Sequence, residues 1–254
     1  MEKASINGIQ IAYTRKGTGK PLVLVHGYPL DHTIWDKILP LLENNFDIIT
    51  PDLRGFGQSD VVESQYSIAD MAADIAGLLD QLGIEKTTIA GHSMGGYVSL
   101  AFARAYPERV LGLGLVASQA PADPPEGKQK RYDAAAEIMK TGVRPVAESM
   151  SAKLTSDERV QAFVRDLIAE QQPAGLAGAL KAMAERDDST SALSGFKFPV
   201  AIVHGEVDEL IPVQRAQEIK AAIPHAALME LSGVGHMPMM ENPQITATTL
   251  KNLL

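Results

Sequence analysis

Apolar and polar positions follow two different periods along the chain, and these periods predict strands and helices in turn. Residues 2–15 alternate at a period of two around Asn7 and Gly8, the pair favoured in two-residue turns, which predicts a β-hairpin. Continuous apolar runs at 22–25 and 48–50 are typical of strands that are buried on both faces. The start of the chain therefore predicts a sheet with at least one antiparallel hairpin.

The clearest helical period covers residues 67–82, where apolar side chains recur on one face. Ser67 and Asp70 have the spacing of a capping box at its start, and Gly83 predicts its end. Residues 33–42 also have a helical pattern, which their proline is expected to kink or shorten. Helices thus separate the predicted strands.

This alternation predicts an α/β fold with a mostly parallel sheet of about eight strands and helices on both faces. Further predicted strands cover 86–90, 110–116, 200–203 and 226–231, and further helices cover 96–105, 213–222 and a final segment from Asn242. The alternation stops at Ser118. A Pro-rich entrance, helical stretches near 128–141, 143–151, 156–171 and 174–187, and a Ser/Gly/Thr-rich exit predict an inserted helical cap. We therefore expect a core domain of residues 1–118 and 195–254, with a cap of residues 119–194.

Composition narrows the class of protein. The chain has 254 residues, a formal net charge of −8 and no cysteine, and its pI is near 5.3. The acidic balance argues against nucleic acid or an anionic membrane as partner, and the lack of cysteine excludes disulfides and a thiol nucleophile. The N-terminus has no apolar leader, so we expect a cytoplasmic protein. The expected partner is a small-molecule substrate. The sequence leaves open whether copies associate into a homo-oligomer.

Residues 91–95 read Gly-His-Ser-Met-Gly between a predicted strand and a predicted helix. G-x-S-x-G in that context is typical of a nucleophile elbow, a strained turn that exposes the serine hydroxyl above the sheet. The glycines are expected there because a Cβ would collide with the neighbouring strand or helix. Ser93 is therefore the candidate nucleophile.

A serine hydroxyl needs a base within hydrogen-bond reach and a group that orients this base. The chain order of serine, acid and histidine that accompanies such an elbow assigns the acid to Asp208 and the base to His236. Each follows a predicted strand, and the carboxyl ends of parallel strands are where open α/β sheets bind ligands. Asp123 is a rival acid, but it lies further along its loop.

The tetrahedral intermediate also needs backbone donors for its oxyanion. The candidates are the N–H groups of Met94, directly after the serine, and of Tyr28 in the loop after the third strand. Pro29 has no N–H. Side chains expected near the mouth of the site are Leu30, Ile211 and Met237, whereas the cap methionines Met139, Met150 and Met183 are expected mainly to pack the cap's core.

The remaining histidines are interpreted as structural. His26 and His92 are expected to support their loops and His204 to be buried and hydrogen-bonded, while His32 and His225 are expected at the surface. No group of histidines or carboxylates has metal-ligand spacing on one element, so the sequence predicts no metal and no cofactor.

With these motifs in order, the chain resembles the α/β-hydrolase-fold superfamily with a helical cap. The resemblance rests on residues 26–29 (His-Gly-Tyr-Pro), 52–59 (Asp-Leu-Arg-Gly-Phe-Gly-Gln-Ser), 91–95, 205–208 and 235–236. It implies the branch of carboxylesterases, enol-lactonases, carbon–carbon bond hydrolases and cofactor-free haloperoxidases or perhydrolases. Serine at the elbow argues against the dehalogenases and epoxide hydrolases, which use aspartate there.

The function expected from these residues is hydrolysis of a small, largely apolar carboxylic ester through an acyl-enzyme. Fold and motifs do not specify the substrate, so three alternatives stay open. A lactonase or carbon–carbon hydrolase would need cations for a carboxylate substrate, for which Arg131, Arg144 and Lys153 are candidates. Perhydrolysis is a side reaction of the same machinery, and a ligand sensor would keep the residues but turn over slowly.

Overall fold

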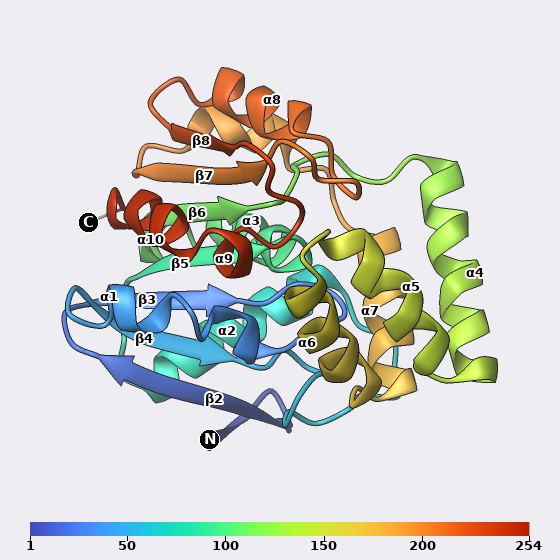
Figure 1. The fold of residues 1–254 in the computed structure, drawn as a ribbon. Coiled ribbons are helices and arrows are strands. Elements are labelled where there is room, and N and C mark those ends of the chain that lie inside the picture. The colour runs from blue at the N-terminus through green and yellow to red at the C-terminus, as the bar shows by residue number, and fades with distance from the viewer. Residues whose placement is uncertain (254) are drawn as a thin grey trace.

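The computed structural model describes residues 1–253 and is built around one sheet of eight strands (Figure 1). The strands are β1 (Glu2–Ile6), β2 (Ile9–Gly17), β3 (Lys20–Val25), β4 (Phe46–Pro51), β5 (Thr87–His92), β6 (Val110–Val116), β7 (Val200–Gly205) and β8 (Ala227–Leu231). Their order across the sheet is β1-β2-β4-β3-β5-β6-β7-β8. The pairs β1–β2 and β2–β4 are antiparallel and all others are parallel, which confirms the predicted mostly parallel sheet and its N-terminal hairpin.

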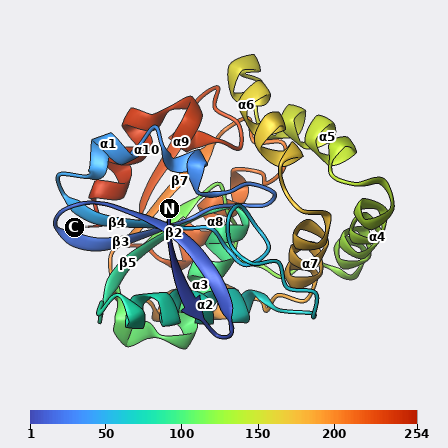
Figure 2. The same cartoon turned by 90° about the horizontal axis from the view of Figure 1, so that it is seen from below.

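Helices cover both faces of the sheet (Figure 2). The α-helices are α1 (Leu39–Leu42), α2 (Ile68–Gln81), α3 (Met94–Ala105), α4 (Pro125–Thr141), α5 (Arg144–Leu154), α6 (Glu158–Ala169), α7 (Pro173–Ala184), α8 (Gln214–Ala222), α9 (Pro238–Glu241) and α10 (Pro243–Lys251). The 3₁₀ helices are η1 (His32–Trp35), η2 (Pro107–Arg109) and η3 (Thr190–Gly195). One apolar cluster joins α2, α3 and α8 to the sheet, and a second joins η1, α1, α9 and α10 to it. The central strands are consequently buried on both faces.

Helices α4 to α7 form an insertion between β6 and β7, beyond the carboxyl ends of the parallel strands (Figure 1). Helices α4 and α7 pack together, as do α5 and α6. Buried side chains of α4 and α7 belong to the first apolar cluster of the sheet, and those of α5 and α6 belong to the second. The insertion therefore shares its apolar packing with the core, and its status as a separate domain of residues 119–194 stays a prediction.

Two local differences from the sequence-based prediction have physical causes. The helix expected over 33–42 is divided into η1 and α1, and Pro40 occupies the first turn of α1, where its missing N–H costs no hydrogen bond. The short helix α9 was not predicted, because four residues are too few to show a period. None of the helices in residues 1–253 combines the length and the apolar composition that crossing a bilayer requires.

Candidate active site

Ser93 lies at the tight turn between β5 and α3 and has φ 51° and ψ −113°, a backbone conformation that residues other than glycine rarely adopt. The surrounding backbone holds this conformation. The Ser93 N–H donates to the carbonyl of Val116 (2.9 Å), and the Ser93 carbonyl accepts from the N–H of Gly96 (2.9 Å) and the hydroxyl of Ser118 (2.9 Å). Hydrogen bonds thus occupy the backbone N–H and carbonyl of Ser93 at this turn, and Ser93 also lines a cavity.

The two outer glycines of residues 91–95 are required by close approach. A Cβ on Gly91 would collide with the carbonyl oxygen of Gly95, and one on Gly95 would collide with the carbonyl oxygen of Val25 on β3. A side chain at either position would therefore push α3 away from the sheet and displace Ser93, as expected for this turn.

His236 and Asp208 lie together, although they belong to different loops. The Nδ1 of His236 is 2.6 Å from Oδ2 of Asp208, and the loop after β7 supplies the aspartate while the loop after β8 supplies the histidine. Both side chains are almost completely buried. Because Nδ1 is engaged by the carboxylate, Nε2 is the nitrogen left to exchange a proton with a second group.

The surroundings of Asp208 keep it ionised. Its Oδ1 accepts from the N–H groups of Leu210 (2.9 Å) and Ile211 (3.0 Å), and Nε2 of His204 lies 3.3 Å from Oδ2. Burial by itself raises the pKa of Asp208, but the hydrogen bonds from His204 and His236 outweigh it and hold the pKa below its usual value. A carboxylate that is ionised and fixed in this way can orient and stabilise a charged imidazole.

The backbone of His236 is anchored from both the insertion and the core. Its N–H donates to the carbonyl of Leu154 at the end of α5 (2.9 Å), and its carbonyl accepts from Nε2 of His92 (2.8 Å). The Glu241 carboxylate accepts from the N–H groups of Gly235 (3.0 Å) and Met237 (3.1 Å) on either side of it. Burial and the neighbouring His236 hold the pKa of His92 well below its usual value, so His92 is a neutral donor.

Ser93 and His236 line the same cavity, of about 220 Å³. The apolar lining residues are Met150, Leu180, Met183, Leu210 and Ile211, and the remaining ones are Tyr28, Tyr97, Gln119 and Arg131. Burial raises the pKa of the Tyr28 hydroxyl, so this phenol is neutral in the cavity wall. Among the described lining residues, Arg131 is the one with a permanent charge.

The predicted oxyanion donors have positions that fit the role. Met94 is the first residue of α3, so its N–H has no acceptor within the helix and lies at the positive end of the helix dipole. Tyr28 lines the cavity, in the turn that the hydrogen bond from the N–H of Leu30 to the carbonyl of Gly27 closes (3.0 Å). Their action on an oxyanion stays a prediction.

Of the three predicted substrate-contacting residues, the structure brings only Ile211 to the cavity. Leu30 and Met237 are fully buried in the second apolar cluster and do not line it. Sequence patterns could not separate these cases, because all three are apolar residues close to site loops.

The cap methionines differ in position. Met150 and Met183 line the cavity, whereas Met139 is exposed, which makes the expectation of core packing wrong for Met139.

Sequence analysis also missed Tyr97, Gln119, Leu180 and Leu210. Tyr97 had a usable signal, since it lies one helical turn after the elbow serine and therefore on the same side of α3. Asp123 pairs with Arg131 and with Arg186 (2.8 Å) rather than with a histidine, which leaves Asp208 as the acid beside His236.

The other histidines behave mostly as expected. His26 accepts from the N–H of Leu53 through Nε2 (2.9 Å), and Nε2 of His204 lies 2.8 Å from the carbonyl of Ile211. His225 is exposed, whereas His32 is half-buried: its side chain is 14% exposed and its Nδ1 lies 2.7 Å from Asp52. His32 is thus less exposed than predicted, because the buried carboxylate of Asp52 pairs with it.

Asp31, His32 and Asp52 form the one group in residues 1–253 whose oxygen and nitrogen ligand atoms lie close enough for a metal, within 4.8 Å of one another. Asp52 already accepts from the backbone N–H groups of His32 (3.0 Å) and Gln58 (2.9 Å), and Asp31 accepts from Thr33. These hydrogen bonds explain the group as a link between two loops, and we assign no ion to it.

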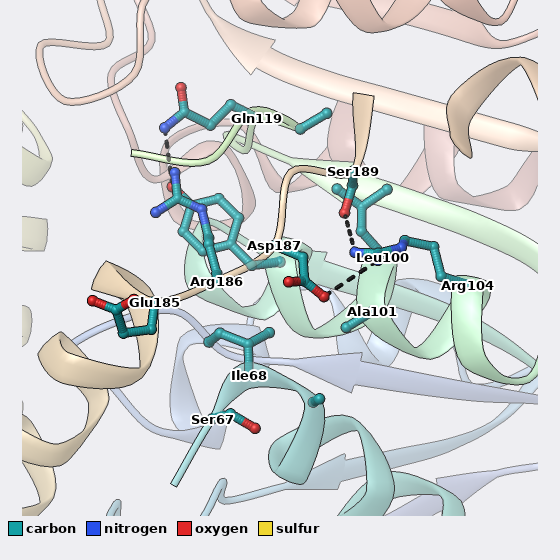
Figure 3. A pocket seen from close by; sticks show the side chains of 13 residues that line it. Ser67, Ile68, Leu100, Ala101, Arg104, Gln119, Glu185, Arg186, Asp187 and Ser189 are labelled. Carbon is teal, nitrogen blue, oxygen red and sulfur yellow. Dashed lines mark hydrogen bonds and ion pairs between the residues drawn. The ribbon is translucent and has the colours of Figure 1, made fainter. Parts of the chain in front are cut away.

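A second cavity, of about 250 Å³, adjoins the first (Figure 3). The two share Tyr97 and Gln119, whose amide Nε2 lies 3.4 Å from the Tyr97 hydroxyl. Arg186 lies in the second cavity (Figure 3). Its guanidinium is 4.3 Å from the centre of the Tyr97 ring. Tyr97 and Gln119 therefore line both the Ser93 cavity and a neighbouring cavity whose lining includes several charged side chains.

Known proteins resemble the chain over nearly all of its length. The sequence profile described as alpha/beta hydrolase fold matches residues 20–243. A thermophilic esterase from Thermogutta terrifontis, solved with malate bound, has a TM-score of 0.94 and 35% identity and covers 98% of this chain and 96% of its own. A putative non-heme chloroperoxidase from Synechocystis is 31% identical over 247 residues, 90% of this chain and 88% of that protein. The enol-lactonase from Burkholderia xenovorans has the same fold, with a TM-score of 0.91, 23% identity and 99% of both chains covered.

Proposed function

The chain belongs to the alpha/beta hydrolase fold family, and from this premise we propose that it is a serine hydrolase of small, largely apolar carboxylic esters. The observation that carries the proposal is the shared cavity: Ser93 and His236 line it together, and Asp208 holds the other side of the His236 ring. The esterase from Thermogutta terrifontis, at 35% identity, supports ester hydrolysis over the other reactions of the family.

In the proposed mechanism, Nε2 of His236 takes the proton of the Ser93 hydroxyl as its oxygen attacks the ester carbonyl. Asp208 keeps the imidazole in the required tautomer and stabilises its charged form. The N–H groups of Tyr28 and Met94 hold the negative oxygen of the tetrahedral intermediate, a contribution worth on the order of 10²–10³ in rate per donor.

The charged His236 then returns its proton to the leaving alkoxide, and an ester between the acyl group and Ser93 remains. Water, deprotonated by His236, attacks this acyl-enzyme, and the acid is released with Ser93 restored. The apolar lining side chains Met150, Leu180 and Leu210 suit a hydrocarbon acyl or alcohol group. Each step of the proposed mechanism uses side chains, backbone N–H groups or water.

The test is a panel of p-nitrophenyl esters of increasing acyl length with the wild-type protein and Ser93→Ala. We expect hydrolysis of short esters by the wild type and its loss in Ser93→Ala with an unchanged melting temperature. Ser149→Ala, which removes an exposed hydroxyl on α5, is the matched control and is expected to keep full activity. Full activity in Ser93→Ala would overturn the proposal.

A further inference from the structure

Arg131 brings a guanidinium from α4 into the wall of the Ser93 cavity. Its Nε pairs with Asp123, and its Nη1 lies 3.4 Å from the sulfur of Met183. A thioether is a weak acceptor compared with a carboxylate or a carbonyl. The end of the guanidinium that faces Met183, another lining residue, is therefore poorly satisfied within the protein.

Two guanidinium groups share the single carboxylate of Asp123. Arg186, whose side chain is 3% exposed, lies 2.8 Å from one oxygen of Asp123, and Arg131 pairs with the other. Burial alone raises the pKa of Asp123, but its hydrogen bonds to Arg186 and Arg131 hold it below the usual value, so the carboxylate is ionised. The three side chains together carry one excess positive charge.

The surroundings do not neutralise this charge inside the cavity. Asp188 also interacts with Arg186, but it is exposed and accepts from the N–H groups of Ala122 (3.1 Å) and Thr190 (2.8 Å). No acidic side chain is among the described residues that line the Ser93 cavity. A partly buried cation without a full partner is unfavourable, and an anionic ligand would relieve that cost.

A purely structural role for Arg131 does not explain its position in the cavity wall. Asp123 is already held by Arg186, which also donates to the carbonyls of Pro121 (2.8 Å) and Met183 (2.9 Å). The link between the loop before α4 and the end of α7 therefore exists without Arg131. Its position in the cavity wall is the feature that a structural role leaves unexplained.

We infer that Arg131 is a specificity-determining residue that binds a free carboxylate of the substrate, so that the preferred substrates are carboxylate-bearing esters or lactones. This inference rests on the proposed ester hydrolysis at Ser93. A carboxylate can accept two parallel hydrogen bonds from a guanidinium, and the charge makes each stronger than a neutral hydrogen bond. The far end of an otherwise apolar substrate would thus be recognised, while its ester lies at Ser93.

The test compares two pairs of esters that differ only in charge. In the first pair the acyl part ends in a carboxylate or its primary amide (mono-p-nitrophenyl adipate and the adipamate ester). In the second pair, 4-acetoxybenzoate and 4-acetoxybenzamide, the alcohol part carries the carboxylate or the primary amide. Rates with Ser93→Ala are subtracted as the background, and the measured quantity is the ratio of kcat/KM for the charged ester to that for the neutral one.

We expect the wild type to favour the charged member of at least one pair, which also identifies the side of the ester that faces Arg131. Arg131→Gln should lower this ratio about tenfold or more, the scale of hydrogen bonds to charged groups. Arg131→Lys should keep part of the preference. Arg144→Gln, which removes an exposed arginine at the start of α5 outside the cavity, is the matched control and should leave the ratio unchanged.

Two outcomes would overturn the inference in different ways. If the wild type hydrolyses both members of each pair above the Ser93→Ala background, but Arg131→Gln leaves both ratios as they are, Arg131 does not bind substrate and the ester hydrolase proposal stands. If the wild type hydrolyses no member of either pair above that background, the proposed function fails and the inference fails with it.

Discussion

Asp208 shows how several partners fix the orientation of a single side chain in this site. Both of its oxygens are occupied, Oδ1 by two backbone N–H groups and Oδ2 by His236 and His204. The carboxylate therefore cannot rotate without breaking hydrogen bonds in a buried place, which costs about 1–3 kcal/mol for each unsatisfied group. The fixed carboxylate in turn fixes the orientation of the His236 imidazole.

Replacement of Asp208 by Asn should lower turnover strongly, by up to ~10⁴ in kcat, because an amide favours the wrong imidazole tautomer and does not stabilise its charge. The measurement is steady-state hydrolysis of a p-nitrophenyl ester. Asp123→Asn is the matched control, since Asp123 pairs with arginines instead of His236. A large loss in Asp123→Asn with little change in Asp208→Asn would show that the acid is misassigned.

The lowered pKa of Asp208 also predicts how stability depends on pH. A carboxyl group whose pKa is lower in the folded protein stabilises it above the unfolded pKa, about 3.9 for aspartate, and this contribution is lost as the pH falls through the folded value. The free energy of unfolding should therefore fall more steeply below about pH 4 in the wild type than in Asp208→Asn. Chemical denaturation at several pH values measures both slopes, and equal slopes would contradict the prediction.

At this scale the sequence predicts residues with local signatures better than residues defined by packing. Ser93 has its elbow, and Asp208 and His236 each follow a strand, so the structure finds all three at the expected ends of strands. Leu30 and Met237 lie in the second apolar cluster and not in the lining of the Ser93 cavity, because the direction of a loop side chain depends on what it packs against. A short stretch of sequence does not show this packing, because the contacting residues are distant in the chain.

Among the elements, α2 is the one that the sequence describes most completely. Ser67 accepts from the N–H of Asp70 (3.1 Å) and the Asp70 carboxylate accepts from the N–H of Ser67 (2.8 Å), so the predicted capping box is present. Helix α7 is less predictable, because its position depends on a distant loop. Gly175 on α7 lies so close to Gly55 that a Cβ would collide with the Gly55 carbonyl oxygen.

Gly175→Ala should therefore move α7 away from the loop of residues 52–59 and destabilise the protein by roughly 1–3 kcal/mol, the usual cost of overpacking. Because Leu180 and Met183 on α7 line the Ser93 cavity, KM for a p-nitrophenyl ester should change as well. Urea unfolding and steady-state kinetics measure the two effects. Gly195→Ala is the control, since a Cβ there meets nothing within 4 Å, and equal stability of the two variants would refute the account of this contact.

On the scale of the whole molecule, the site is assembled from the sheet and the insertion together. The loops after β7 and β8 supply Asp208 and His236, β5 leads to Ser93, and α5 holds the His236 backbone through Leu154. Strand–helix alternation predicts the parallel sheet, and hence that chain-distant loops meet at its carboxyl end. It cannot predict the hydrogen bond from His236 to Leu154 or the pairing of two arginines with Asp123, because these depend on how the insertion packs.

The central claim, that Ser93 carries the acyl group during ester hydrolysis, is tested most directly by trapping that intermediate. The wild-type protein is mixed with excess p-nitrophenyl acetate, quenched in acid within milliseconds, digested and examined by mass spectrometry. We predict that one acetyl group appears on the peptide containing Ser93 and is absent from Ser93→Ala treated in the same way. Continued hydrolysis with no acetylation of this peptide, or with the acetyl group on another residue, would contradict the account.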